Sequence, residues 1–230
     1  MKQLVLDIRP DEAPTLNNFV CGDNAELLAT LGQLAAADPA LRPQPPRLYL
    51  WGRPGSGRSH LLEASCALAH ANGRAVHRFA GAEVGAALPE TPGALLAIDD
   101  VEQLSPAAQI AAFNAFNRAH GNGQSLLLSG PAAPVGLALR EDLRTRIGQG
   151  LIFEVRPLDD DALAAILASL AGRRGLPLAD EVIEFLLRHG RRELPSLLAV
   201  LDTLDAASLE RKRPITLPLL RELMQQGLAI

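Results

Sequence analysis

The stretch Gly52–Ser59, which reads Gly-Arg-Pro-Gly-Ser-Gly-Arg-Ser, decides how the rest of the chain is interpreted. It matches the phosphate-loop pattern G-x-x-x-x-G-K-[ST] with one change, because Arg58 stands where the pattern has lysine. Glycines at these positions let successive backbone N–H groups point into one concavity, and the helix that follows adds the positive end of its dipole. The residues predicted to hold the phosphates of a nucleotide are Pro54, Gly55, Ser56, Gly57, Arg58 and Ser59.

Three side chains at the end of this loop carry specific expectations. Ser59 offers a hydroxyl to Mg²⁺, and Arg58 offers positive charge to the β-phosphate. Because arginine is a longer planar fork than lysine, we predict that nucleotide binding survives and that hydrolysis is slow. His60 either packs near the nucleotide or lies on the helix surface. A glycine-rich surface turn is the alternative, which the apolar run before the loop disfavours.

Short apolar runs alternate with Ala- and Leu-rich helical patterns around the loop. Strands separated by helices imply βαβ units and a parallel sheet that is buried on both faces. The five predicted strands are Leu48–Trp51, Ala75–Phe79, Ala94–Ile98, Ser125–Leu128 and Leu151–Val155. Helices are predicted near 24–37, 59–72, 106–119 and 137–146, and beyond Pro157 only helices, near 159–170, 179–189, 195–209 and 218–227.

These patterns predict three parts of the chain. Residues 1–23 carry isolated hydrophobic residues among polar and turn residues, so we expect an extended segment there, with residues 1–13 as a separate arm. Residues 14–156 form the predicted α/β nucleotide-binding domain. Residues 157–230 form a smaller, all-helical domain, with Asp159 and Thr216 as plausible helix N-caps.

The run Ala94–Ile98 ends in two carboxylates, Asp99 and Asp100, about forty residues beyond the phosphate loop. This is the Walker B arrangement, in which a buried strand brings an acidic side chain beside the loop. Asp99 is the predicted Mg²⁺ ligand, directly or through water, together with Ser59. Asp100 stands where a water-polarising carboxylate would stand. Many strands end in aspartate without any such role, and that remains the alternative.

Composition limits the class of protein. The chain has 230 residues, of which 48% are hydrophobic and 21% charged, so it can bury a sizeable core. A net charge of −4 argues against a protein that coats nucleic acid through bulk electrostatics. The two cysteines, Cys21 and Cys66, have no Cys-x-x-Cys spacing, and no signal peptide or long apolar span is visible. We therefore expect a cytoplasmic protein with reduced thiols and no membrane segment.

With these motifs the chain resembles the AAA+ family, and within it the DnaA branch with its Hda-type regulators, over residues 14–228. Four further segments carry the resemblance. Thr15–Asn24 is similar to the adenine-side box of that branch, Leu143–Leu151 to its arginine-finger box, Arg191–Leu194 to its sensor 2 motif, and Pro214–Glu222 to the last segment of its helical lid. Taken alone, several of these segments are weak, but their order and spacing behind the phosphate loop are specific.

The resemblance implies the fold and several residue roles. The fold would be an AAA+ P-loop domain with a five-stranded parallel sheet between helices, followed by a small helical lid. Phe19 and Val20 would lie beside the adenine of ADP or ATP, and Arg192 would act as the sensor arginine. Arg146 would be an arginine finger that acts on a partner's nucleotide. Without the resemblance, Arg146 is a solvated arginine of a polar connecting segment, and Arg192 belongs to a charge cluster at a helix start.

Two departures from the DnaA pattern shape the functional expectation. The usual sensor 1 aspartate after the fourth strand aligns with Pro131, and Ser129 is the side chain nearby that could partly substitute. Together with Arg58, this indicates a site that holds nucleotide rather than turning it over. The sequence also ends after the lid segment, where DnaA continues into a helix-turn-helix domain, so no sequence-specific DNA binding is expected.

The first residues match the pattern Gln-Leu-x-Leu-x-aliphatic, which resembles the peptide that docks on the β sliding clamp. The matching residues are Gln3, Leu4, Leu6 and Ile8. In an extended segment the alternate apolar side chains share one face and can fill an apolar pocket, while the glutamine donates and accepts hydrogen bonds. A first strand of the fold, or a frayed terminus, is the alternative.

If the resemblance holds, the chain regulates replication initiation: it docks on the clamp and stimulates hydrolysis of DnaA-bound ATP, with weak or no ATPase activity of its own. Homo-oligomers are possible. Three alternatives compete with this interpretation. They are an autonomous AAA+ ATPase, a DnaC-like helicase loader, for which the segment before the AAA+ start is short, and an orphan DnaA fragment.

Overall fold

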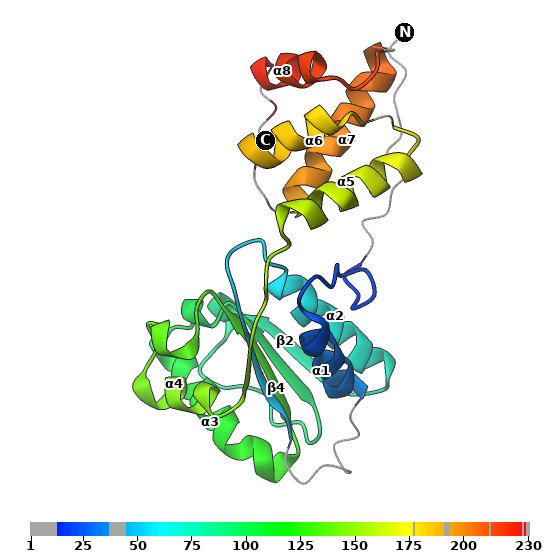
Figure 1. The fold of residues 1–230 in the computed structure, drawn as a ribbon. Coiled ribbons are helices and arrows are strands. Elements are labelled where there is room, and N and C mark those ends of the chain that lie inside the picture. The colour runs from blue at the N-terminus through cyan, green and yellow to red at the C-terminus, as the bar shows by residue number, and fades with distance from the viewer. Residues whose placement is uncertain are drawn as a thin grey trace. The chain divides into compact units, whose positions relative to one another are not determined.

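The computed structural model describes residues 13–36, 45–176, 178–190, 194–211, 213–226 and 228. The chain divides into two compact units, which Figure 1 shows as an α/β part and a helical part. The first unit contains residues up to Gly52 and Gly57–Val155, and the second contains Arg156 onward together with the loop residues Arg53–Ser56. Within the described ranges, no helix has the length and apolar character needed to cross a membrane.

The first unit is built on a five-stranded parallel sheet, as the sequence predicts. The strands are β1 (Arg47–Trp51), β2 (Val76–Ala80), β3 (Leu95–Asp99), β4 (Ser125–Gly130) and β5 (Leu151–Glu154). Their order is β2-β3-β4-β1-β5, and all four neighbouring pairs are parallel. The strand that leads into the phosphate loop and the strand that ends in Asp99 therefore flank β4, with all three carboxyl ends at the same edge.

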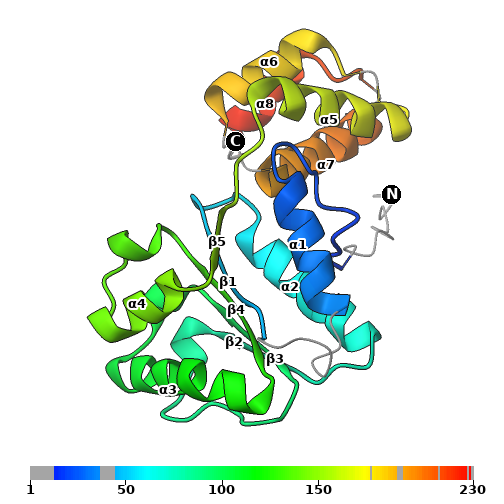
Figure 2. The ribbon, with the colours of Figure 1, turned by 60° about the horizontal axis from the view of Figure 1, so that its bottom comes forward.

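Helices cover both faces of this sheet, which Figure 2 shows in side view. Successive residues of a strand point to opposite faces. Leu48 and Leu50 pack with α1 (Ala25–Ala36) and α2 (Arg58–Ala71), whereas Tyr49 packs on the other side with α3 (Pro106–Asn122) and α4 (Glu141–Gly148). Burial on two faces thus explains the apolar runs of the central strands β1, β3 and β4. The prediction fails for β5, where Leu151 and Ile152 are exposed because this strand lies at the edge of the sheet.

Two expectations from the sequence need correction. Residues 13–23 are not extended: they form turns, one of which is held by reciprocal hydrogen bonds between Thr15 and Asn18, at 2.9 and 3.1 Å. The helix expected over 137–146 begins instead at Glu141. A short 3-10 turn, Pro134–Gly136, precedes this helix. Leu137 and Leu139 lie in irregular backbone but are buried, so in the sequence they look like part of the buried face of a helix.

The second unit is all-helical, as expected. Its helices are α5 (Asp160–Arg173), α6 (Asp180–His189), α7 (Leu194–Arg211) and α8 (Leu217–Gln225). They share a leucine-rich core that includes Leu163, Leu186 and Leu204. Asp159 caps α5 by accepting a hydrogen bond from the Ala162 N–H at 2.7 Å. Thr216 precedes α8 but makes no side-chain cap bond.

A buried arginine, Arg74, links three segments of the α/β unit through hydrogen bonds. Arg74 follows α2, and its guanidinium donates to the Gly93 carbonyl at 2.8 Å, to the Leu34 carbonyl at 3.0 Å and to Ser125 Oγ at 2.6 Å. These acceptors belong to the end of α1, the turn before β3 and the start of β4. One side chain therefore satisfies polar groups from three segments that are distant in sequence.

We predict that Arg74→Met lowers the free energy of unfolding by about 3 kcal/mol, because it leaves buried acceptors without a donor. The matched control is Arg78→Met, since Arg78 forms only a half-exposed ion pair with Glu63 at 3.1 Å. Such pairs contribute about 0–1 kcal/mol. Urea unfolding followed by circular dichroism measures both variants, and equal losses would refute the special role of Arg74.

Candidate functional site

The loop between β1 and α2 has the backbone that a phosphate cradle requires. Gly55 and Gly57 adopt positive φ angles of 77° and 94°, a region that residues with a side chain rarely enter. A Cβ on Gly57 would also lie 2.6 Å from Cε2 of Phe19, so the ring occupies the space that a side chain would need. Both observations explain why the sequence has glycine here.

Two buried polar atoms of the loop have no hydrogen-bond partner in the part of the chain that the structure describes, and an anion fits them. They are the Ser56 hydroxyl oxygen and Nη1 of Arg58. Buried polar groups are normally paired, and both of these can donate to phosphate oxygens. The Arg58 side chain is only 11% exposed and begins α2, where unpaired backbone N–H groups of the first turn also favour an anion. Ser59, the next residue, is exposed. The loop residues thus fit the group that the sequence pattern implies.

Of the two carboxylates at the end of β3, Asp100 lies beside Arg58. Asp99 is the last residue of β3, and Asp100 follows it with a left-handed backbone, φ 51° and ψ 62°. Nη2 of Arg58 is 3.4 Å from Oδ1 of Asp100. Gln103, which sequence reasoning did not single out, donates its amide to Oδ2 of Asp100 at 3.3 Å. The Asp100 carboxylate is therefore held from two sides.

The surroundings of Asp100 raise the pKa of its carboxyl group. Burial raises the pKa of Asp100, the neighbouring charge of Asp99 raises it further, and Arg58 opposes both. Burial likewise raises the pKa of Glu102, with a smaller contribution from Asp100. A site that already crowds three carboxylates around one arginine disfavours more negative charge unless a cation accompanies it.

The N-terminal turns are attached to the helix that follows the phosphate loop. Nε2 of His60 is 3.0 Å from the Thr15 carbonyl, and its ring lies 5.7 Å from that of Phe19. Since Phe19 also covers Gly57, residues 15–19 lie against the loop. The ring of His60 thus joins the N-terminal turns to α2. Whether it also lies near a bound nucleotide stays a prediction. Val20, also predicted beside the adenine, is half-buried in the same segment.

Arg146 lies away from this site. It is in the last turn of α4 rather than on a connecting segment, which corrects the prediction. Its guanidinium makes a 3.3 Å hydrogen bond to Gln149 and lies 5.7 Å from the ring of Phe113. Because α4 packs on the face of the sheet opposite α2, the structure does not bring Arg146 and the phosphate loop together.

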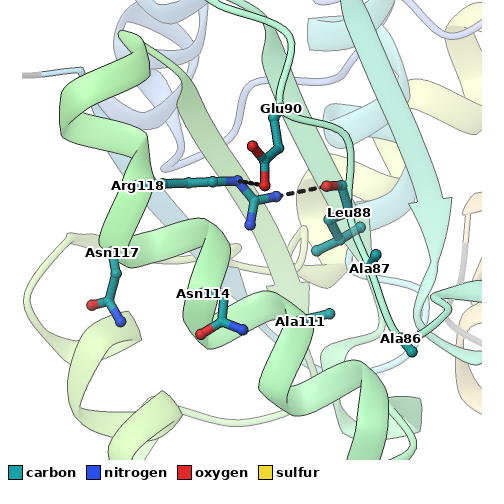
Figure 3. A pocket seen from close by; sticks show the side chains of 8 residues that line it. All are labelled: Ala86, Ala87, Leu88, Glu90, Ala111, Asn114, Asn117 and Arg118. Carbon is teal, nitrogen blue, oxygen red and sulfur yellow. Dashed lines mark hydrogen bonds and ion pairs between the residues drawn. The ribbon is translucent and has the colours of Figure 1, made fainter.

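Two pockets on the α3 side of the first unit were not predicted from the sequence. The first, of about 720 Å³, is lined by Phe113, Arg140, Glu141, Asp142, Thr145, Arg146 and Gln149. The second, of about 550 Å³, lies between α3 and the loop before β3 (Figure 3). There Arg118 donates to the Leu88 carbonyl at 2.7 Å and faces Glu90 at 3.6 Å. The arginine-finger-like box Leu143–Leu151 supplies Thr145, Arg146 and Gln149 to the first pocket, whereas no motif of the sequence analysis lies at the second.

Several predicted site residues cannot be placed. Arg192 and the four residues of the clamp-like pattern, Gln3, Leu4, Leu6 and Ile8, lie outside the described residues.

We predict that Gly57→Ala weakens ADP binding at least about tenfold, because a left-handed alanine costs roughly 1–2 kcal/mol and the new methyl group displaces Phe19. Gly32→Ala is the control, since nothing lies within 4 Å of a Cβ at that position in α1. It should keep ADP affinity and slightly raise stability. Calorimetric titration gives both affinities, and unchanged ADP binding by the Gly57 variant would exclude this loop as the phosphate site.

Comparisons with known proteins agree with this geometry. The family model described as "Hda, lid domain" matches residues 159–224. Domain III of the Thermotoga maritima replication initiation protein DnaA aligns with a TM-score of 0.74 at 20% identity, covering 95% of this chain and 98% of that one. Aquifex aeolicus DnaA bound to AMPPCP aligns with a TM-score of 0.70 at 23% identity, covering 88% of this chain and 68% of that one.

A third likeness shows how widely the fold is shared. A Thermotoga maritima RuvB structure aligns with a TM-score of 0.68 at 18% identity, covering 94% of this chain and 74% of that one. These likenesses show the fold, and the match over residues 159–224 identifies the lid. The chain therefore shares the fold of DnaA domain III, and its residues 159–224 match the lid domain described for Hda.

Proposed function

We propose that this protein is a nucleotide-bound regulator of replication initiation that docks on the β sliding clamp and stimulates hydrolysis of DnaA-bound ATP. The observation that carries the proposal is an Hda-type lid, residues 159–224, joined to a phosphate cradle with unpaired buried donors. In the cradle, Ser56 and Arg58 bind the phosphates of ADP or ATP. Ser59 and Asp99 hold the accompanying Mg²⁺, which neutralises phosphate charge when it is bound.

The chain's own site is suited to holding its nucleotide. The carboxylate of Asp100 would have to orient a water molecule for hydrolysis in this site, but it is already engaged by Arg58 and Gln103. Pro131, at the position of the usual sensor 1 aspartate, offers no polar side chain. These features support slow turnover, and they leave stimulation of a partner as the productive activity.

Arg146 supports an action on a partner. It belongs to α4, which packs on the face of the sheet opposite α2, and it borders a pocket of about 720 Å³. Its guanidinium makes a 3.3 Å hydrogen bond to Gln149 and a cation–π contact with Phe113. A head-to-tail contact between AAA+ proteins would place such a residue in the neighbour's nucleotide site. There, water attacks the γ-phosphorus, the bond to the β-phosphate oxygen breaks, and the guanidinium stabilises the charge that develops.

The proposed finger is tested by Arg146→Ala. We expect clamp and nucleotide binding to persist, while stimulation of DnaA's ATP hydrolysis falls by about a thousandfold, the range known for arginine fingers. Arg78→Ala, which removes an equal charge from strand β2, should keep full stimulation. Single-turnover hydrolysis with DnaA and loaded clamp measures both variants. Full stimulation by the Arg146 variant would refute the finger, and brisk turnover by the isolated chain would favour an autonomous ATPase.

Clamp docking is tested through the N-terminal pattern. Gln3→Ala combined with Leu4→Ala should abolish co-purification with the β clamp, because it removes the polar anchor and one apolar side chain. Asp7→Ala is the control, since its side chain alternates with the apolar face and should be dispensable. Retained clamp binding by the double variant, or equal loss by the control, would remove the docking assignment.

A further inference from the structure

Ser129 is a buried polar side chain at the centre of the sheet's carboxyl edge. It is the next-to-last residue of β4, and its exposed fraction is 0%. Leu128 pairs with Ile98 of β3, and Ser129 itself pairs with Leu50 of β1. Ser129 therefore lies level with Asp99 and next to the strand that leads into the phosphate loop.

The hydroxyl of Ser129 connects both acidic residues. Its Oγ donates a short hydrogen bond to Oδ1 of Asp99 and accepts the N–H of Asp100 at 3.1 Å. A hydroxyl has one hydrogen to donate and lone pairs to accept, so it can do both at once. The Asp100 N–H also lies 3.2 Å from Oδ1 of Asp99, which closes a three-membered network.

This network fixes two conformations that would otherwise vary. Among the described residues, Asp100 alone combines a side chain with a positive φ, and such backbone is held in place only when its surroundings secure it. The Asp99 carboxylate could rotate about its terminal torsion, which has a broad energy profile. With Oδ1 engaged by Ser129, the rotation is set and Oδ2 keeps its lone pairs.

We propose that Ser129 is a positioning residue for the Mg²⁺ that accompanies the nucleotide: it orients the Asp99 carboxylate so that Oδ2 serves the metal. This inference rests on the nucleotide site proposed above. A neutral donor suits the position, because another carboxylate beside Asp99 and Asp100 would repel both. Hydrogen-bond partners of metal-binding carboxylates set ligand orientation, and their removal typically costs 10–100-fold in metal affinity.

The test compares Ser129→Ala with Ser65→Ala. Ser65 is equally buried, at 0% exposure, but its hydroxyl donates to the Leu61 carbonyl within α2 at 2.7 Å, away from the acidic pair. The measurement is the ADP dissociation constant by calorimetry with excess Mg²⁺ and with EDTA. The ratio of the two constants reports the metal separately from any general damage to the nucleotide site.

In the wild-type protein we expect Mg²⁺ to tighten ADP binding. In Ser129→Ala this gain should fall by about tenfold, with the affinity in EDTA unchanged, and Ser65→Ala should keep the full gain. An undiminished gain in Ser129→Ala, or an equal loss with and without Mg²⁺, would overturn the positioning role alone. Absence of ADP binding by the wild type would overturn the nucleotide site and this inference together. If Ser129→Ala does not fold, Ser129→Cys, whose thiol is a weak donor, gives the same comparison.

Discussion

The site depends on the backbone of the phosphate loop, which turns through positive φ angles at Gly55 and Gly57 that glycine adopts readily. Gly57 is constrained twice, by a φ of 94° and by the ring of Phe19, which takes the room of a Cβ. The same ring lies beside His60, which bonds to Thr15. The conformation of one glycine thus connects the phosphate loop with the N-terminal turns, and a change there would be felt in both.

The arrangement of charges supports the proposal that this loop binds a nucleotide and hydrolyses it slowly. In a site that binds phosphate, positive charge is needed at the loop, and arginine supplies it over a longer reach than lysine does. Here that reach extends to Asp100, so the guanidinium that we propose for phosphate binding also contacts the nearby carboxylate. The proposed phosphate binding and the contact with Asp100 then both depend on one side chain, Arg58. Arg146 is separate from it, since α4 packs on the face of the sheet opposite α2.

Much of this could be predicted from the sequence because the deciding features are local. Apolar runs of strand length, the glycine spacing and the acidic end of β3 are each contained in a few consecutive residues, and the structure has all of them. The error at α4 has an equally local cause, since Leu137 and Leu139 are buried from irregular backbone beyond Pro134. The contacts of Arg58 with Asp100, of His60 with Thr15 and of Ser129 with Asp99 join residues 42, 45 and 30 positions apart. No periodicity in the sequence reports such pairs, because the packing of the sheet and α2 creates them.

The attachment of residues 15–19 to α2 has a consequence for any partner held by the N-terminal residues. Four residues, 9–12, separate Ile8 from the first described residue, Ala13. A fully extended chain spans at most about 3.5 Å per residue, so the five residue steps from Ile8 to Ala13 can span no more than about 18 Å. A clamp bound to the residues up to Ile8, as proposed, would be held close to the phosphate loop, because residues 15–19 lie against that loop. If the clamp docks there as proposed, so short a connection would give it an effective concentration of about millimolar around the α/β unit.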